Sequence, residues 1–262
     1  FFIYQHQNRV VLAGRRSGKT VLFSVLTYAA ALAKPQSEIL VCCQTIAQSK
    51  DLYWRKFTNL IDPLFHPSIV QSINNQDRII ELINGSRISV TGVENPEALL
   101  GRSLDLLLCD EYQGFKPDIH PIILAPMLTD RQGKAVFSGT ARRGSPLQEY
   151  YEKGLDPNNK YWKSFLVTTE ESGSPAGSPE ALAQARESMS RDQYLQEYFA
   201  IPYADSGYVY PEFDTENIIE SYEHSNQILH LGLDFNIGRM AAVVAIKDQN
   251  NLIIIDEIIL TN

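Results

Sequence analysis

Short apolar runs recur along the first two thirds of the chain, and several are followed by a stretch of helical composition. Four apolar runs bounded by turn residues predict buried strands, at residues 9–13, 38–43, 104–109 and 134–138. Residues 18–33 have the composition of a helix, which Pro35 ends. Thr45 is a candidate N-cap for an amphipathic helix that reaches about Ile61. Alternating strands and helices favour a mostly parallel sheet flanked by helices, so the predicted fold class is α/β.

The dipeptide Asn84-Gly85 separates the apolar runs 78–83 and 87–91. Both residues tolerate positive φ, and such a pair between two strands is a strong signal for a tight turn. The sequence therefore predicts a β-hairpin in this part of the chain.

The composition changes near Ser172. Residues 172–179 are rich in Ser, Gly and Pro and predict a loop, whereas residues 188–199 predict a helix with Ser190 as its cap. After an irregular, Tyr-rich stretch come two or three predicted strands, at residues 228–235, 240–247 and 251–259, with a turn at 248–250. We therefore expect three parts: a domain at 1–204, a linker at 205–227 and the start of a second domain at 228–262.

The composition is globular, with 44% hydrophobic and 21% charged residues among 262. No apolar stretch approaches the roughly 20 residues that span a bilayer, so we expect no membrane segment. Cys42, Cys43 and Cys109 lie in apolar runs, which favours a reducing compartment and argues against disulfides or a zinc site. The net charge of −8 argues against a protein that coats nucleic acid, but it allows DNA contact through a local basic surface. The chain begins with Phe1 and ends at Asn262 just after an apolar run, so we expect a piece of a longer protein.

The strongest candidate for chemistry lies between the first predicted strand and the first predicted helix. A glycine-rich loop in this position presents backbone N–H groups to a phosphate at the helix N-terminus. Lys19 would reach the β- and γ-phosphates of ATP, and the Thr20 hydroxyl would bind Mg²⁺. Ala13 stands where the motif G-x-x-x-x-G-K-[ST] has its first glycine, so the match is incomplete. The loop residues expected to bind nucleotide are Gly14, Arg15, Arg16, Ser17, Gly18, Lys19 and Thr20.

Two carboxylates, Asp110 and Glu111, follow the buried run 104–109. Ligands bind at the carboxyl ends of parallel strands, so this is where a magnesium ligand belongs. Asp110 would hold Mg²⁺ through its water shell, and Glu111 would act as general base on the attacking water. Ser138 and Thr140, which close the next strand, could sense the γ-phosphate and couple hydrolysis to motion.

An arginine aimed at the γ-phosphate can raise the rate of hydrolysis by roughly 10³–10⁵. The candidates are Arg15 and Arg16 in the loop, Arg102 ahead of the acidic strand, and Arg142 with Arg143 after Thr140. The adenine base is usually held by a Gln or an aromatic residue upstream of the loop, where Gln5 and Gln7 are available. The sequence alone identifies neither the catalytic arginine nor the residue that binds adenine.

Three motifs in this order and spacing, AGRRSGKT, LLLCDEYQGF and FSGT, resemble the ATPase half of the large subunit of phage terminases. The later stretch MSRDQYLQEYFAIPYADSGYVYPEF resembles the segment that joins this family's ATPase to its nuclease, and LGLDFNIGRMAAVVAI resembles the opening strands of an RNase H-like nuclease. The resemblance covers nearly the whole chain. Each motif alone is shared by many ATPases, whereas the ordered set is specific.

The resemblance implies a P-loop ATPase of the ASCE (RecA-like) type, which forms a homo-oligomeric ring on the procapsid and drives double-stranded DNA into it. It implies that Lys19, Asp110 and Glu111 carry hydrolysis with ATP and Mg²⁺, and it favours Arg15 or Arg16 as the catalytic arginine. The partners it implies are a portal protein and a small terminase subunit. The chain would be a monomer in isolation, in the cytoplasm of the host cell.

For the second domain, the resemblance places Asp234 on the first carboxylate that binds the nuclease metals, Mg²⁺ or Mn²⁺. Two-metal cleavage of a phosphodiester needs several converging carboxylates. In this family the remaining acids lie beyond Asn262, and Asp256 and Glu257 do not obviously replace them. We therefore expect that this chain alone does not cut DNA.

Two other functions compete with the packaging motor. A superfamily-2 nucleic-acid helicase shares the P-loop, the Asp-Glu pair and a related third motif, but it needs a second RecA-like domain, for which residues 161–262 are too short. A nucleotide-gated binding module without catalysis would have no use for a water-activating base such as Glu111. Separation of a forked duplex would favour the helicase.

Overall fold

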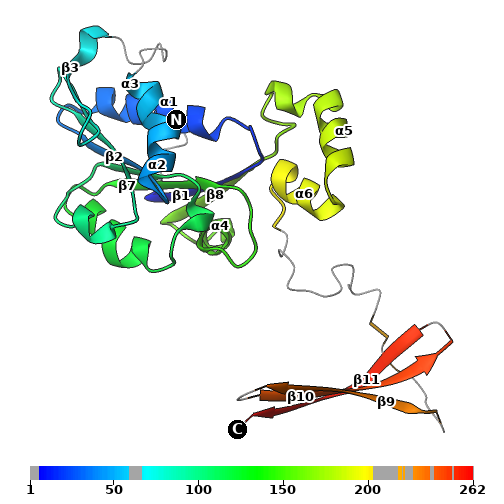
Figure 1. Cartoon of the computed structure of the whole chain (residues 1–262). Helices are drawn as coiled ribbons and strands as arrows, with labels where there is room; N and C mark the ends of the chain where they lie inside the picture. Colours follow the sequence, from blue (N-terminus) through cyan, green and yellow to red (C-terminus); the bar gives the residue numbers. More distant parts are fainter. Residues whose placement is uncertain are drawn as a thin grey trace. The chain divides into compact units, whose positions relative to one another are not determined.

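The computed structural model describes residues 6–58, 67–202, 218–219, 221, 227–236, 239–249 and 251–261. The chain divides into two compact units, Phe1–Asp205 and Ser206–Asn262, which are considered separately below (Figure 1). Most of the stretch expected to be a linker, 205–227, lies outside the described residues, as do Gln5 and the expected helix end near Ile61.

An eight-stranded sheet forms the centre of the first unit, with strand order β3-β4-β5-β2-β6-β7-β1-β8. Six neighbouring strands, from β5 to β8 in this order, run parallel, and β3 and β4 add antiparallel pairs at one edge. The predicted, mostly parallel sheet is confirmed. The strands are β1 (Asn8–Ala13), β2 (Glu38–Cys43), β3 (Val70–Asn74), β4 (Ile79–Leu82), β5 (Arg87–Gly92), β6 (Leu106–Cys109), β7 (Lys134–Gly139) and β8 (Trp162–Val167).

Helices and single helical turns lie between these strands and after β8. The longer ones are α1 (Lys19–Ala33), α4 (Pro146–Leu155), α5 (Pro179–Ser188) and α6 (Arg191–Phe199). A continuous helical segment consists of α2 (Ile46–Ser49), the π-turn η2 (Lys50–Trp54) and α3 (Arg55–Thr58). The short turns are η3 (Pro67–Ile69), η4 (Pro96–Leu99), η5 (Tyr112–Gly114), η6 (His120–Leu124), η7 (Pro126–Leu128) and η8 (Pro175–Gly177).

Capping residues fix the ends of several helices as predicted. The Thr45 side chain accepts a hydrogen bond from Gln48 N, and the Gln48 side chain accepts one from Thr45 N, which makes a complete capping box. Ser190 caps α6 in the same way. The predicted helix 188–199 nevertheless begins later, because Ser188 ends α5 and the cap at Ser190 starts a new helix at Arg191.

The predicted hairpin joins β4 and β5 in antiparallel register, with Glu81 opposite Arg87. Its turn differs from the expectation in one residue. Gly85 has a positive φ of 80°, whereas Asn84 is not among the residues with positive φ. The Asn84 side-chain amide instead donates to Ala31 O at 2.8 Å, which ties the turn to the end of α1.

The central strands β1, β2, β6 and β7 are buried on both faces, which explains why they are continuous apolar runs in the sequence. Alternate residues of β1 belong to different core clusters: Val10 and Leu12 to one, Val11 and Ala13 to the other. Helix α1 and the segment 46–58 cover the second cluster, and α4 with η5–η7 covers the first. All three cysteines are free and buried, as predicted.

His120 lies in the first cluster, among the rings of Phe137, Tyr150 and Trp162. Its Nδ1 is 2.9 Å from Tyr150 Oη. Burial, with a smaller contribution from the charge of Lys153, lowers the pKa of His120 from 6.5 to about 4.

This histidine should make stability depend on pH. In the unfolded chain His120 takes up a proton as the pH falls below 6.5, whereas in the folded chain it does so only near pH 4. The free energy of unfolding should therefore fall by up to about 3 kcal/mol as the pH is lowered from 6.5 to 4. His120→Phe keeps a ring in the aromatic cluster and should reduce that fall. Urea unfolding of both proteins at the two ends of the window measures it, and equal losses in both would contradict the prediction.

The second unit contains a three-stranded antiparallel sheet of order β11-β10-β9. Its strands, β9 (Leu229–Asn236), β10 (Arg239–Asp248) and β11 (Asn251–Thr261), confirm the predicted runs. Asp234 lies on β9 opposite Ala241, while Glu257 on β11 pairs with Val243. These two acids are therefore separated by a whole strand. Among the described residues, no group of three or more His, Cys, Asp or Glu side chains could hold a metal ion.

Within the described part of the chain, no helix combines the length and the apolar character needed to cross a bilayer.

Candidate nucleotide-binding site

A cavity of about 650 Å³ lies at the carboxyl end of β1, where the chain turns into α1. Seven of its lining residues were predicted to contact nucleotide: Arg15, Arg16, Ser17, Gly18, Lys19, Thr20 and Thr140. The predicted base Glu111 also lines it, together with Val21, Lys56 and Glu197. Lys19 and Glu111 thus line one cavity, although Lys19 begins α1 and Glu111 follows β6.

The two glycines of the loop meet different requirements. Gly18 precedes α1 with a φ of 92°, a conformation that residues with a Cβ rarely adopt. Gly14 does not line the cavity, and a Cβ there would collide with Thr169 and the Tyr198 carbonyl. Ala13, which stands in place of the motif's first glycine, ends β1 with its side chain buried in the core. The loop therefore forms its turn and lines the cavity without that glycine.

Lys19 begins α1 and lies against the loop. Its Nζ donates to Ala13 O at 3.3 Å and to Gly14 O at 3.5 Å, so the ammonium group stays at the cavity wall. The Ser17 hydroxyl is buried and has no hydrogen-bond partner within the described structure. A buried hydroxyl without a partner is costly unless a ligand provides one, which fits a cavity that accepts phosphate oxygens.

Asp110 follows β6 and is 1% exposed. Three donors surround its carboxylate: Tyr53 Oη is 2.5 Å from Oδ2, Ser138 Oγ is 2.5 Å from Oδ1, and Glu111 N is 3.0 Å from Oδ1. Ser138 is fully buried and donates to Asp110, so it does not line the cavity. Of the two residues expected to sense the γ-phosphate, Thr140 is the one on the cavity.

Glu111 occupies an unusual backbone conformation. Its φ is 54°, in the left-handed region, and it directly precedes the turn η5. Gln113 Nε2 donates to its carboxylate at 2.5 Å, which fixes the side chain at the cavity. The turn thus separates the two acids, so that Asp110 points into the protein and Glu111 into the cavity.

Magnesium is implied by the phosphate loop, and the donor set fits it. Mg²⁺ usually takes one or two protein ligands and completes its shell with phosphate oxygens and waters. Thr20 lines the cavity, and its hydroxyl is an oxygen ligand of this kind. The buried Asp110 carboxylate, to which Tyr53 Oη donates at 2.5 Å, would act on the cation through a water. A site that takes most of its ligands from the nucleotide needs no cluster of acids.

The phosphate loop is attached to the segment after β8 and to α6. Gly14 N donates to Val167 O at 2.9 Å, and Thr169 Oγ1 donates to Arg15 O at 2.8 Å. The Arg15 guanidinium pairs with Glu197 of α6, with both Nε and Nη2 2.8 Å from Oε2. α6 therefore contacts the loop through both a charged side chain and the backbone.

The other predicted arginines do not line this cavity. Arg102 precedes β6, so it lies at the amino-terminal edge of the sheet, where it borders a different cavity with Glu38 and Arg87. The opposite edge carries the phosphate loop, so Arg102 does not line the cavity of its own chain. Arg142 and Arg143 follow β7 outside the cavity lining. Gln7, a candidate for the adenine contact, precedes β1 at the amino-terminal edge.

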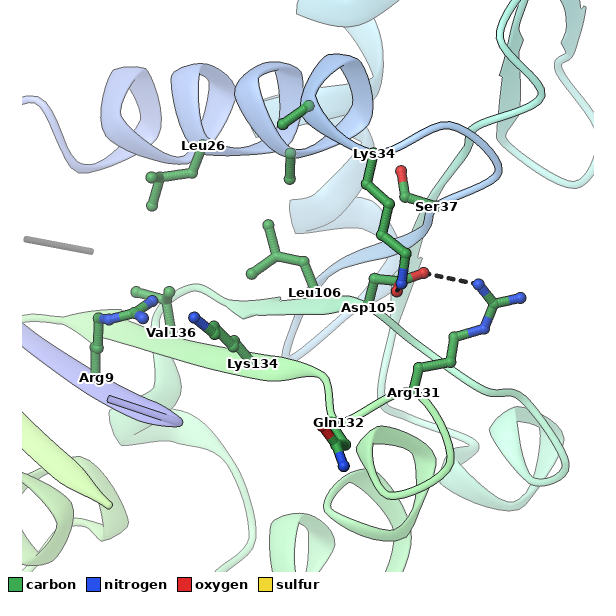
Figure 2. A pocket seen from close by; sticks show the side chains of 12 residues that line it. Arg9, Leu26, Lys34, Ser37, Asp105, Leu106, Arg131, Gln132, Lys134 and Val136 are labelled. Atoms are coloured by element: carbon green, nitrogen blue, oxygen red, sulfur yellow. Dashed lines mark hydrogen bonds and ion pairs between the residues drawn. The ribbon is translucent and has the colours of Figure 1, made fainter. Parts of the chain in front are cut away.

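Figure 2 shows a second cavity, of about 200 Å³, between α1 and the amino-terminal edge of the sheet. Asp105 pairs there with Lys34 at 2.5 Å and with Arg131 at 2.8 Å. Burial acts to raise the pKa of Asp105, but the hydrogen bonds from Lys34 and Glu38 N and the two cations outweigh it and lower the pKa. These ion pairs join the end of α1 to the loops before β6 and β7.

The order of the strands in the sheet identifies the class of P-loop protein. β7 lies between β1, which carries the phosphate loop, and β6, which carries Asp110 and Glu111. This inserted strand defines the ASCE class of P-loop NTPases, as predicted.

Within that class, the chain belongs to the terminase large subunit family. The family model described as "Terminase large subunit, T4likevirus-type, N-terminal" matches residues 10–217. A curated relative, the terminase large subunit of Escherichia phage T5, is 26% identical over 256 residues. The match covers 93% of this chain and 56% of the relative, so the chain spans little more than half of that protein's length.

Solved structures share the fold. The ATPase domain of the Thermus phage P74-26 large terminase matches with a TM-score of 0.61 at 19% identity, over 74% of this chain and 88% of that chain. The HK97 bacteriophage large terminase matches with a TM-score of 0.62 at 15% identity, over 94% of this chain and 57% of that chain. A large terminase from a thermophilic bacteriophage, solved in complex with ADP, matches with a TM-score of 0.61 at 12% identity, over 99% of this chain and 64% of that chain.

Sequence reasoning did not find Lys56 and Glu197, which line the cavity, or Tyr53, which donates to Asp110. Tyr53 and Lys56 come from the helical segment 46–58, where the apolar pattern assigns Tyr53 to the core and Lys56 to solvent. Their positions depend on how this segment packs against β6, which no local signal in the sequence specifies. The amphipathic pattern predicted the helical segment 46–58 but not that it contributes side chains to the site.

Proposed function

We propose that this chain is the ATP-hydrolysing motor of a phage terminase, which translocates double-stranded DNA into a procapsid. The observation that carries the proposal is the shared cavity of Lys19 and Glu111. A nucleotide-binding switch needs the lysine, whereas hydrolysis also needs a base that can reach water at the γ-phosphate. The family to which the chain belongs and the ADP-bound relative of the same fold support it.

Each residue of the site would have its own role in the binding and hydrolysis of ATP. The N–H groups of the loop and the start of α1 would bind the β-phosphate, with Lys19 between the β- and γ-phosphates. Thr20 and Asp110 would hold Mg²⁺, which when bound neutralises charge on the phosphate oxygens. Glu111 would take the proton of the attacking water. Thr140 would contact the γ-phosphate.

The remaining parts of the proposal concern the whole protein. The motor would act as a ring on the procapsid with a portal protein and a small terminase subunit, in the cytoplasm of the host. In the longer protein it would be coupled to a metal-dependent nuclease that begins at β9 with Asp234. Because Asp234 and Glu257 lie on different strands, two apart, we propose that this chain alone does not cut DNA.

Hydrolysis of ATP by the chain, with and without double-stranded DNA, tests the proposal. Mg²⁺-dependent release of phosphate that blunt duplex DNA stimulates is the expected result. ATP binding without any hydrolysis would leave only a nucleotide-gated binding module. Separation of a forked duplex during hydrolysis would favour a helicase instead.

The ion pair between Arg15 and Glu197 should compete with the nucleotide. The Arg15 side chain is 60% exposed, so the pair contributes little to folding, but the Glu197 carboxylate adds negative charge beside the cavity. Glu197→Gln should therefore tighten ATP binding by roughly two- to fivefold, and Arg15→Ala should weaken it. Titration with a fluorescent ATP analogue measures both.

Glu187→Gln is the matched control for this pair, because Glu187 lies on α5 outside the cavity lining. It should leave the affinity for ATP unchanged. If Glu197→Gln weakens binding, Glu197 must contact the nucleotide favourably and the predicted competition is wrong.

A further inference from the structure

Gln113 contacts the side chain of Glu111, the predicted base. It lies two positions further along the chain, in the turn η5, and its Nε2 donates to Glu111 Oε2 at 2.5 Å. Among the hydrogen bonds and ion pairs of the described residues, this is the one that reaches the Glu111 carboxylate. The position of that carboxylate at the cavity therefore depends on Gln113.

The orientation of the Gln113 amide follows from chemistry. A carboxylate only accepts hydrogen bonds, so the amide turns its NH₂ group towards Glu111 and its oxygen away. That oxygen is buried and accepts no hydrogen bond from the described part of the chain. A buried acceptor without a partner lowers stability. The fold thus keeps this amide at a cost, which a role in the site would explain.

The amide oxygen lies against the end of β7. A Cβ at Gly139 would collide with Gln113 Oε1, and it would come within 2.8 Å of Leu147 Cδ2. Gly139 is the last residue of β7 and directly precedes Thr140, which lines the cavity. The amide is therefore confined between Glu111 and the end of this strand, where a residue without a side chain leaves room for it.

The backbone of the turn η5 is anchored on both sides of Gln113. Tyr112 is fully buried, and its ring centroid is 4.8 Å from that of Phe115 and 4.8 Å from that of Phe137 on β7. Phe115 N donates to Tyr112 O at 3.0 Å, which closes the turn. Because the backbone is fixed in this way, the Gln113 side chain presents its amide at a defined place.

We propose that Gln113 is a positioning residue for hydrolysis, which holds the Glu111 carboxylate where it would meet the attacking water. The inference rests on the proposed function and adds a residue to that site. A general base must lie within hydrogen-bond reach of its proton, and a displacement of about 1 Å can lower a rate by roughly 100-fold. Gln113 does not line the cavity, so its loss should affect the chemical step and not the binding of ATP.

Gln113→Met tests this, because it keeps the length of the side chain and removes its N–H donors. The rate of a single turnover of ATP should fall roughly 10- to 100-fold. The Kd for a fluorescent ATP analogue should stay within about twofold of the wild-type value. A fall in rate of less than about threefold, or an equal loss of affinity, would overturn the inference. A wild-type protein that hydrolyses no ATP would instead contradict the proposed function.

A double variant separates positioning from a general disturbance of the site. In Glu111→Gln the base is already absent, so adding Gln113→Met should lower the residual rate by less than about threefold. Radiolabelled ATP and long single-turnover reactions measure this residual rate. If the second change lowers it as much as it lowers the wild-type rate, Gln113 acts independently of Glu111 and the inference is wrong.

Gln148→Met is the matched control. Gln148 on α4 also donates through its Nε2 to a glutamate, with Glu152 Oε1 2.9 Å away. Its Oε1 is likewise buried without a hydrogen-bond partner among the described residues, and it does not line the cavity. This variant should hydrolyse ATP at the wild-type rate.

Gly139→Ala gives an independent reading if Gln113→Met does not fold. The added Cβ would displace the Gln113 amide and leave every donor and acceptor of the site in place. The single-turnover rate should fall about tenfold or more, with the affinity for ATP within about twofold of the wild type. A wild-type rate in this variant would show that the amide need not lie beside β7, and the inference would fail.

Discussion

Glu111→Gln should lower the turnover number for ATP by roughly 10²–10⁴-fold while ATP still binds. The amide has the size of the carboxylate, and Gln113 can still hydrogen-bond to its oxygen, but it cannot accept a proton from water. The change removes one negative charge from the cavity, so affinity for ATP should stay equal or become slightly tighter. Single-turnover hydrolysis with excess protein separates this chemical step from nucleotide exchange.

Glu149→Gln on α4 makes the same chemical change outside the cavity and should hydrolyse ATP at the wild-type rate. Both variants should melt at the temperature of the wild type. If Glu111→Gln retains more than about a tenth of the wild-type rate, Glu111 is not the general base and another group activates the water.

The second large effect should come from Lys19→Ala, which acts on binding as well as on chemistry. Hydrogen bonds from an ammonium to phosphate are charge-assisted, so their loss should raise the Kd for ATP by roughly 10- to 100-fold. Hydrolysis should fall below detection, because Lys19 would also stabilise charge on the γ-phosphate. Calorimetric titration with a non-hydrolysable ATP analogue measures the binding part.

Lys34→Ala is a control on the same helix. Lys34 follows α1 at its far end, where it pairs with Asp105 across the second cavity (Figure 2). It should bind ATP like the wild type. Normal ATP binding by Lys19→Ala would place the phosphates elsewhere and remove the basis of the proposed motor.

Local signals predicted the elements well where they are strong. Gly18 and Lys19 marked the start of α1, and Thr45 and Ser190 marked capped helices, because these features depend on neighbours three or four residues away. β8 was not predicted, because Lys163 and Ser164 interrupt its apolar residues and its sequence shows neither a continuous apolar run nor a regular alternation. Its strand identity comes from pairing with β1.

Only the residues of the site that belong to sequence motifs could be predicted. The loop, Asp110 and Glu111 could be found because strand ends in parallel sheets meet at one edge. The burial of Ser138 against Asp110 could not be predicted, since the direction of a side chain at a strand end does not follow from one sequence. Tyr53 was missed because its contact with Asp110 spans 57 positions.

The backbone conformation of Glu111 has a consequence for the thermal stability of this protein. A left-handed conformation costs a residue with a side chain roughly 1–2 kcal/mol, which glycine would not lose. Glycine at this position should thus make the enzyme more heat-resistant and leave it unable to turn over. At this residue a gain in thermal stability would cost the proposed catalytic activity, so stabilising substitutions that keep activity have to be sought in other loops.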